Sequence, residues 1–502
     1  MGRTKKAAKN VATGLFNKAA LMLLAFVTKT VFIRLLGAEY NGVSSLYTNI
    51  LSVLALAELG VGNVLMFYLY SALDIGNKEE ICALVYEFKR IYNAIIVCVL
   101  SIGLALVPFL QLLVKSSLNK NELIVYYLLY LANSVASYFV VYRTTVVKAD
   151  QNEYILNNIS TVSTVLMYIL QLGFLCKYRN FLGYLIIQVI CTIFNNLTQN
   201  FIAVKKYPYL KNKTIVKSHL DKRALIGNVK ATFLFKVSDT ILDQTDNIII
   251  SAMIGTVAVG MYSNYYMLIA YLVNIAGIIA NGMVASYGNL YVEGNAEKNH
   301  IMFKVSMLLF SLYGTLCSVC YICLIQDFIP MWVGKQYLIG NNLVYAIIAV
   351  FYLRMVTNTV WIYRSAMGLF KEIQYINVVA AVLNIILSIL LGKKLGTSGI
   401  IIATAISRLL TSFWYEAKIV YDKLKESVIE YFLIQIKELI ITIIITWVCI
   451  FITKKIIFAG IVGILMKLAV CIIICCSSEY VVHRKSSECY FLINKIKHLR
   501  SE

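Results

Sequence analysis

Long runs of apolar residues constrain the fold of this chain of 502 residues more than any other feature. Residues 96–113, 378–391, 439–452 and 456–476 consist almost entirely of apolar side chains. A helix rises 1.5 Å per residue, so about 20 such residues cross a hydrocarbon layer about 30 Å thick. Barrel strands are not expected, because the runs lack alternation between apolar and polar residues. The sequence therefore predicts an all-α integral membrane protein.

Composition and charge exclude a soluble domain and a nucleic-acid-binding protein. The chain has 60% hydrophobic and 14% charged residues, whereas soluble domains have roughly 45–50% and 25%. The net charge is +21, but the basic residues gather where apolar runs end, in residues 3–9, 205–223, 418–425 and 484–500. Such a distribution is typical of the cytoplasmic side of a membrane protein. Both termini are expected in the cytoplasm.

Hydropathy predicts about fourteen transmembrane helices, and this even number also returns the chain to the side on which it began. The predicted spans are residues 11–36, 43–72, 89–114, 121–147, 154–176, 181–203, 225–254, 257–285, 301–325, 338–366, 374–392, 398–420, 431–453 and 456–480. The predicted exterior loops between them are mostly very short.

An internal repeat divides these spans into two groups of six. Residues 36–47 match residues 254–265 at an offset of 218, and Tyr142-Arg143 matches Tyr363-Arg364 at an offset of 221. Six spans is an even number, so both copies should insert with the same orientation, related by a pseudo-two-fold axis along the membrane normal. The predicted organisation is an N-lobe at 1–210, a C-lobe at 211–425 and an extra helix pair with a cytoplasmic tail at 426–502.

Charged residues inside the predicted spans indicate a wet, polar interior. An ionised group at mid-bilayer costs at least about 2.5–3.5 kcal/mol, so such groups usually face protein or water. Lys18 and Lys236 are matched by the repeat and are expected to face a central cavity. These charges are Lys18 and Lys29 in the first span, Glu58 in the second, and Lys236, Asp239, Asp243 and Asp246 in the seventh.

Two simpler explanations of these charges stay open. Lys236 could form an internal ion pair with Asp239 or Asp243, which would leave at least one acid over. Glu58 could pair with Lys18 or Lys29, or it could bind a proton or a coupling cation.

Three arginines are candidates for binding phosphate, because a guanidinium can grip phosphate oxygens with two parallel bonds. Arg143 and Arg364 follow tyrosine at matched positions near the ends of spans four and ten. Extension of the side chain to the membrane interface is the alternative role for this pair. Arg354 lies deeper within span ten.

The cysteines do not form a recognisable metal motif. Cys317, Cys320 and Cys323 have helical spacing, but neither a histidine nor a fourth thiol lies near them in the sequence. Packing against apolar neighbours is therefore expected, and no metal site is predicted.

Several motifs resemble Wzx-like polysaccharide flippases, a branch of the multidrug/oligosaccharidyl-lipid/polysaccharide (MOP) exporter superfamily. The motifs are residues 30–37 with Asn41-Gly42, residues 54–62 with Glu58, residues 142–155 with Arg143, and residues 246–250 and 259–265 with Asp246. The resemblance covers nearly the whole chain. It implies a fold of two six-helix lobes around a central cavity, often with two extra C-terminal helices, in a bacterial cytoplasmic membrane.

The implied activity is to move an undecaprenyl-pyrophosphate-linked oligosaccharide from the cytoplasmic to the outer leaflet by alternating access. Capsule, O-antigen or exopolysaccharide synthesis would use it, with a polymerase and glycosyltransferases as partners. The predicted substrate-binding residues are Lys18, Lys29, Lys236, Arg143, Arg354 and Arg364. The predicted ion-coupling residues are Glu58, Asp239, Asp243 and Asp246, with H⁺ or Na⁺ as the ion and no other cofactor.

Two other functions compete with this prediction. A cation-coupled multidrug (MATE-type) exporter has similar lobes, although it typically has twelve spans and an acidic cavity. A membrane polysaccharide polymerase or lipid-linked glycosyltransferase would need an exterior catalytic loop, but residues 37–42 offer only Glu39 as an acid. The chain is therefore expected not to be an enzyme.

Overall fold

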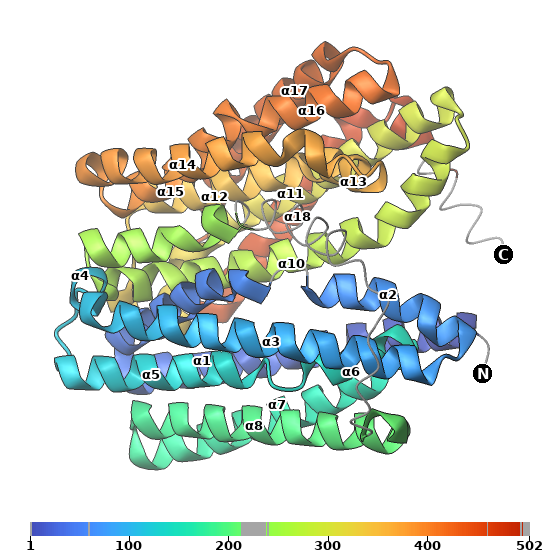
Figure 1. Ribbon diagram of the computed structural model, residues 1–502. Coiled ribbons are helices and arrows are strands. Elements are labelled where there is room, and N and C mark those ends of the chain that lie inside the picture. Colours follow the sequence, from blue (N-terminus) through green and yellow to red (C-terminus); the bar gives the residue numbers. More distant parts are fainter. Residues whose placement is uncertain are drawn as a thin grey trace. The chain divides into compact units, whose positions relative to one another are not determined.

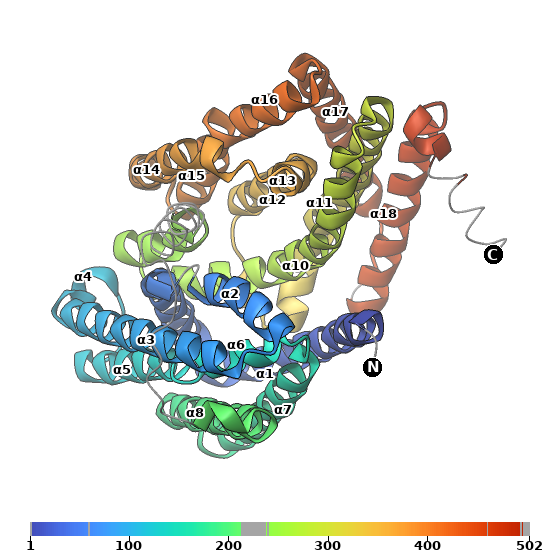
Figure 2. The same ribbon diagram turned by 45° about the vertical axis from the view of Figure 1, so that its right-hand side comes forward.

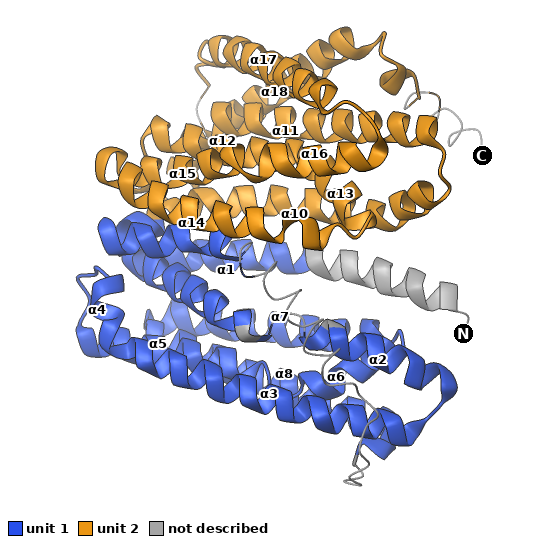
Figure 3. Cartoon of the chain, turned by 45° about the horizontal axis from the view of Figure 1, so that its top comes forward, with its two compact units in different colours: residues 1–260 blue, residues 261–502 orange. Residues whose placement is uncertain are grey.

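A computed structural model describes residues 3–58, 61–211, 237, 240–458, 460–491 and 494, with side chains from residue 20 onward except those of 57, 63 and 211. Every regular element in these ranges is a helix, and no strand occurs among them. The predicted all-α fold is therefore confirmed. The chain forms two compact units, residues 1–260 and 261–502, coloured separately in Figure 3.

Unit 1 is built from long helices joined by short turns (Figure 1). Asparagine side chains begin three of these helices, because Asn77, Asn119 and Asn180 each accept a bond from a backbone N–H of the first turn. The elements are α1 (Arg3–Leu54), η1 (Ala55–Glu58), α2 (Val61–Ile75), α3 (Lys78–Leu106), η2 (Val107–Phe109), α4 (Leu110–Leu113), α5 (Lys120–Ala136), α6 (Val141–Ala149), α7 (Glu153–Tyr178), α8 (Phe181–Lys206), η3 (Pro208–Lys211) and a helix over 240–253.

Within unit 1, α7 packs against both α1 and α8, and α8 also packs against α5. Figures 1 and 2 both show α7 and α8 side by side. Aromatic rings fill the contact between α1 and α8. Phe32 packs edge-on against Phe181 and Tyr184, with centroids 5.5 and 5.1 Å apart. Such burial of large rings is a major stabilising term in a helix packing.

Unit 2 begins inside a helix that starts in unit 1, α10 (Thr256–Val292). It continues with α11 (Ala296–Trp332), η4 (Lys335–Tyr337), α12 (Asn341–Val356), α13 (Asn358–Ala366), α14 (Phe370–Leu395), α15 (Thr397–Leu410), α16 (Ser412–Leu424), α17 (Val428–Thr453) and α18 (Gly460–His483). The closest helix packings are α14 with α15, and α11 with α12 and α18 (Figure 2).

Eleven helices of the described residues are long and apolar enough to cross a membrane, and the bent pair α5–α6 would make a twelfth. The chain is a multi-pass membrane protein. The predicted count of fourteen is higher for two reasons. Helix α1 is counted once although Gly37 interrupts it with non-helical torsion angles, so predicted spans 11–36 and 43–72 fall on either side of a break. Part of predicted span 225–254 lies outside the described residues.

The sequence repeat is matched by repeated local geometry. Gly37 and Gly255 both have positive φ, and so do Gly76 and Gly294. Asn77 and Asn295 each begin a helix with the same side-chain cap. Each of these pairs has the offset of 218 residues that the repeat predicts, so the turns as well as the residues are repeated.

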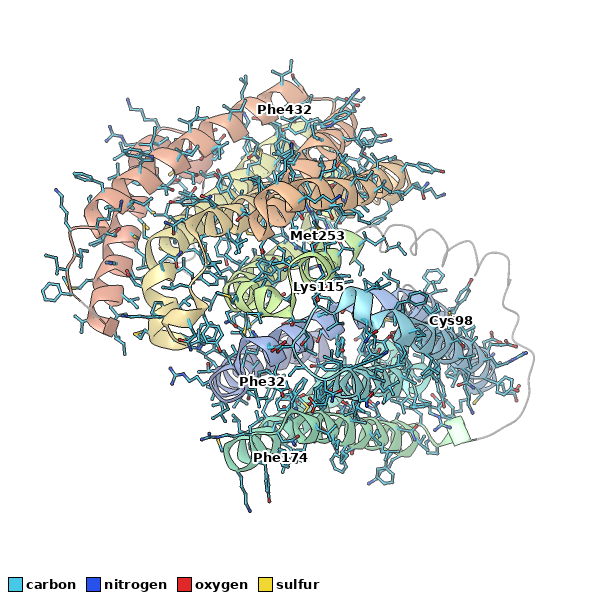
Figure 4. All side chains as sticks on the ribbon, turned by 90° about the vertical axis from the view of Figure 1, so that its left-hand side faces the viewer. Phe32, Cys98, Lys115, Phe174, Met253 and Phe432 are labelled. Atoms are coloured by element: carbon cyan, nitrogen blue, oxygen red, sulfur yellow. The ribbon has the colours of Figure 1, made fainter. Side chains whose placement is uncertain are left out.

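The compact units do not coincide with the repeat boundaries, because residues 240–260 pack in unit 1. Asn49 donates to the Gln244 carbonyl at 3.2 Å. Lys115 Nζ donates to the Met253 carbonyl at 3.2 Å, and both residues are labelled in Figure 4. The Thr256 N–H in turn donates to the Lys115 carbonyl at 2.9 Å. The lobes at 1–210 and 211–425, with 426–502 as an appendage, remain a prediction drawn from the repeat.

The two matched segments cross at small residues. A Cβ atom on Gly42 would overlap the Thr256 carbonyl, and one on Gly260 would overlap the Ala38 carbonyl. Ala38 corresponds to Thr256 in the repeat and Gly42 to Gly260, so the contact is locally two-fold. Asn41 Nδ2 closes it with a 2.9 Å bond to the Gly260 carbonyl. Small residues four apart are the usual means by which membrane helices approach this closely.

We predict that Gly42→Ala destabilises the protein by at least about 1–3 kcal/mol, because the added methyl overlaps backbone that cannot move aside. The matched control is Gly173→Ala in α7, where a Cβ meets nothing within 4 Å. The control should be neutral or stabilising by about 0.5–1 kcal/mol. Thermal unfolding of the purified variants in detergent measures both, and equal melting temperatures would contradict the crossing.

Candidate functional site

Three of the predicted site residues lie outside what the structure describes. They are the Lys18 side chain and all of Lys236 and Asp239. The remaining candidates lie on α1, η1, α6, α12, α13 and the helix over 240–253.

The N-terminal intramembrane charges occupy partly buried positions. Lys29 Nζ lies 5.4 Å from the ring centroid of Phe32, within the range of a cation–π contact. Glu58 ends η1 and accepts a 3.4 Å hydrogen bond at Oε1 from the fully buried Tyr92 hydroxyl. Asp243 and Asp246 are partly buried on one face of their helix. Coupling through these acids stays a prediction.

Arg143 is held by a neutral partner. Its Nη1 donates to Asn200 Oδ1 on α8 at 2.7 Å, and its guanidinium carbon lies 5.6 Å from the centroid of the Tyr142 ring. The guanidinium therefore keeps its positive charge without a carboxylate in this contact. Positively charged, partly buried and next to an aromatic ring, it could hold an anion.

Arg364 is held by a charged partner instead. It is 4% exposed, and its Nη1 lies 2.7 Å from Glu416 Oε2 on α16, whose side chain is 13% exposed. Asn200 and Glu416 lie on the last helices of the two repeats, so the two arginines are bound from the same direction by an amide in one copy and a carboxylate in the other. Arg354, on α12, is partly buried and in contact with protein groups.

The conserved-looking turn after α6 is rigid. Tyr207 donates to Asp150 Oδ2 at 2.7 Å, and Asn152 Nδ2 donates to the same oxygen at 2.6 Å. Burial, together with the hydrogen bond to the nearby Asp150 carboxylate, raises the pKa of Tyr207, so its hydroxyl remains a donor. This network joins the end of α6 to the end of α8 and fixes the helix that carries Arg143.

A polar seam that the sequence did not reveal runs between α11, α17 and α18. Thr315 and Thr442 share a hydrogen bond of 2.7 Å, and Glu438 accepts one of 3.2 Å from Ser311. Cys449, Cys471 and Cys475 are buried together, with Cys320 and Cys323 packed against them. The expectation that Cys320 and Cys323 have no further thiol nearby holds along the sequence but is wrong in three dimensions. Only the helical spacing of Cys471, Cys475, Glu479 and His483 along α18 hinted at this seam.

Unit 2 also contains a long apolar groove of about 890 Å³. Its lining comes from α12, α15 and α17, with Ser318 and Ile322 of α11 and Phe413 of α16. Along α17 the lining runs from Phe432, labelled in Figure 4, to Ile450. Eighteen residues of helix rise about 27 Å, so the groove is almost as long as the hydrocarbon layer is thick.

Solved structures of transporters share this fold. The chain matches no protein-family model and no curated protein by sequence. It is similar to the lipid II flippase MurJ in an inward closed conformation, with 14% identity, a TM-score of 0.67 and coverage of 94% of this chain and 99% of that one.

Two further structures belong to transporters whose titles place them in the MOP superfamily. One is a multidrug resistance MATE family transporter in an inward-facing conformation, with 14% identity, a TM-score of 0.62 and coverage of 81% of this chain and 96% of that one. The other, from Pyrococcus furiosus, has 14% identity, a TM-score of 0.54 and coverage of 84% and 97%. The chain therefore has the fold of these flippases and transporters.

We predict that Glu416→Gln destabilises the protein by roughly 3–5 kcal/mol, because it leaves the buried Arg364 charge without its counter-charge. The double variant Arg364→Met/Glu416→Leu should be more stable than either single variant. Glu293→Gln is the control, since the Glu293–Lys298 pair is more than half exposed and should matter by less than about 1 kcal/mol. Additive losses in the double variant, measured by thermal unfolding, would contradict the pairing.

Proposed function

We propose that this chain is a flippase that moves undecaprenyl-pyrophosphate-linked oligosaccharides from the cytoplasmic to the outer leaflet of a bacterial cytoplasmic membrane. The product would serve the synthesis of a surface polysaccharide such as capsule, O-antigen or exopolysaccharide. The observation that carries this proposal is the apolar groove beside α17.

The groove suits the lipid part of such a substrate. Its lining is almost wholly apolar and it follows α17 for about 27 Å. A long hydrocarbon chain lying in it would replace lipid contacts with protein contacts at little cost, since both surroundings are apolar. A small cationic drug has no part that would need such a groove.

The intramembrane cations suit the headgroup. A pyrophosphate cannot cross hydrocarbon without compensation of its charge. Arg143 offers a guanidinium bound only to amide and aromatic neighbours in its described contacts, and Lys29 lies beside an aromatic ring. Lys18, Lys236 and Arg354 complete the proposed set. Arg364 belongs to it only if phosphate joins or displaces Glu416.

The driving force in this proposal is a proton or sodium ion bound by Glu58, Asp239, Asp243 and Asp246. Both termini would lie in the cytoplasm. The extracellular polymerase and the cytoplasmic glycosyltransferases would be the functional partners, because they consume and supply the lipid-linked sugar.

Multidrug export is the second candidate, because the fold is equally that of MATE transporters. Coverage favours the flippase. The MurJ match leaves out 6% of this chain, which is less than α17 and α18 occupy, so it includes part of this pair; the MATE match leaves out 19%. An enzyme is disfavoured, because Glu39 is bound by Ser116 Oγ and by the Ser117 N–H and hydroxyl, and so holds α1 to the loop after α4.

We predict that Ala349→Trp, which projects an indole into the groove from α12, abolishes delivery of surface polysaccharide in cells that depend on this protein. The matched control is Leu390→Trp, a 55% exposed position on α14 outside the groove, which should deliver normally. Surface polymer is measured on cells with equal amounts of each variant in the membrane. Normal delivery by Ala349→Trp would overturn the assignment of the groove.

A further inference from the structure

Three ionisable side chains meet in the seam between α17 and α18, away from every residue assigned to transport. Glu438 comes from α17, and Glu479 and His483 come from α18, one helical turn apart. They are 4%, 5% and 6% exposed. Two carboxylates this deeply buried are expensive unless positive charge accompanies them.

The positive charge available within the cluster is insufficient. A protonated His483 would leave the three groups with a net charge of −1, and a neutral imidazole would leave −2. Lys304, which lies nearby, is engaged by Glu430, and Lys437 of α17 is exposed. A divalent cation with a neutral imidazole would bring the net charge of the cluster to zero.

The geometry is that of ligands facing a common centre rather than one another. His483 Nε2 lies 3.4 Å from Glu438 Oε2 and 3.3 Å from Glu479 Oε2. Nevertheless His483 Nε2 and both Glu479 oxygens make no well-aligned hydrogen bond with any described residue. One atom from each of the three residues fits within a span of 4.8 Å.

These separations match a small transition-metal site. A tetrahedral Zn²⁺ with bonds of about 2.0–2.2 Å holds neighbouring ligand atoms roughly 3.3–3.5 Å apart. Ser311 on α11 donates to Glu438 Oε2 at 3.2 Å, as an outer partner that orients a metal-binding carboxylate. A cavity of about 90 Å³ borders Glu438 and His483, with room for a water molecule as fourth ligand.

We propose that Glu438, Glu479 and His483 bind one divalent transition-metal ion of the Zn²⁺ class, with water in the remaining position. The ion joins α17 to α18 and thereby holds the helix pair that lies beyond the repeat against α11. The inference is independent of the proposed transport function, since it concerns metal binding and stability alone.

The chain provides two matched controls. His300 and Glu426 form a second histidine–glutamate pair, 2.7 Å apart, at a more exposed place with no third ligand. The buried thiols around Cys471 are the other group that could retain zinc. His300→Ala and Cys471→Ser therefore separate the proposed site from a simple ion pair and from the thiols.

The test uses the full-length protein in detergent, stripped with EDTA and then titrated with ZnCl₂. We expect one Zn²⁺ per chain after desalting, and a melting temperature raised by several degrees. Glu479→Gln and His483→Ala should each lose about tenfold or more in Zn²⁺ affinity and lose the thermal shift, whereas His300→Ala and Cys471→Ser should keep both.

Three results would overturn the proposal. The first is wild-type protein that neither retains Zn²⁺ nor is stabilised by it. The second is unchanged Zn²⁺ affinity in His483→Ala, and the third is loss of the metal in Cys471→Ser. Because the first result needs only the wild-type chain, the proposal can be refuted even if every variant fails to fold.

Discussion

The crossing of Ala38 and Gly42 with Thr256 and Gly260 is the contact on which the rest of the structure depends. Each glycine receives the backbone of the other segment, so neither position has room for a side chain. The contact determines where α10 begins, and α10 leads the chain into unit 2. The repeat that first appeared as a pattern of small residues is thus a packing requirement. It is the membrane counterpart of a close-packed core, since apolar burial alone does not drive membrane helices together.

The two repeats keep their geometry but differ in electrostatics. Arg143 is bound by the amide of Asn200 and Arg364 by the carboxylate of Glu416. One arginine therefore carries an uncompensated charge in this contact, while the other belongs to a buried ion pair. Such divergence is what a transporter with one charged headgroup site would require, because two free cations are not needed where one binds. The helices outside the repeat add what the lobes lack, namely the apolar groove and the polar seam.

Much of the fold could be predicted from the sequence, because membrane helices are determined by local properties. The apolar runs locate the spans, and Gly37, Gly76, Gly255 and Gly294 mark turns whose positive φ the structure contains. The arginine partners, the thiol cluster and the Glu438–Glu479–His483 cluster could not be predicted. Glu438 meets His483 only because α17 and α18 pack together, and nothing local in the sequence gives their register. Lys18, Lys236 and Asp239 lie outside the described residues, so their assignment still rests on pattern and resemblance.

The central claim is that this chain flips a lipid-linked pyrophosphate sugar. The most direct measurement reconstitutes the purified protein in proteoliposomes containing a fluorescent polyprenyl-pyrophosphate oligosaccharide and follows its exposure to an external glycosidase or quencher. The account predicts movement between leaflets with wild-type protein, and its loss in the double variant Lys29→Ala/Arg143→Ala. Wild-type liposomes that move a cationic drug but leave the lipid-linked sugar in place would contradict it.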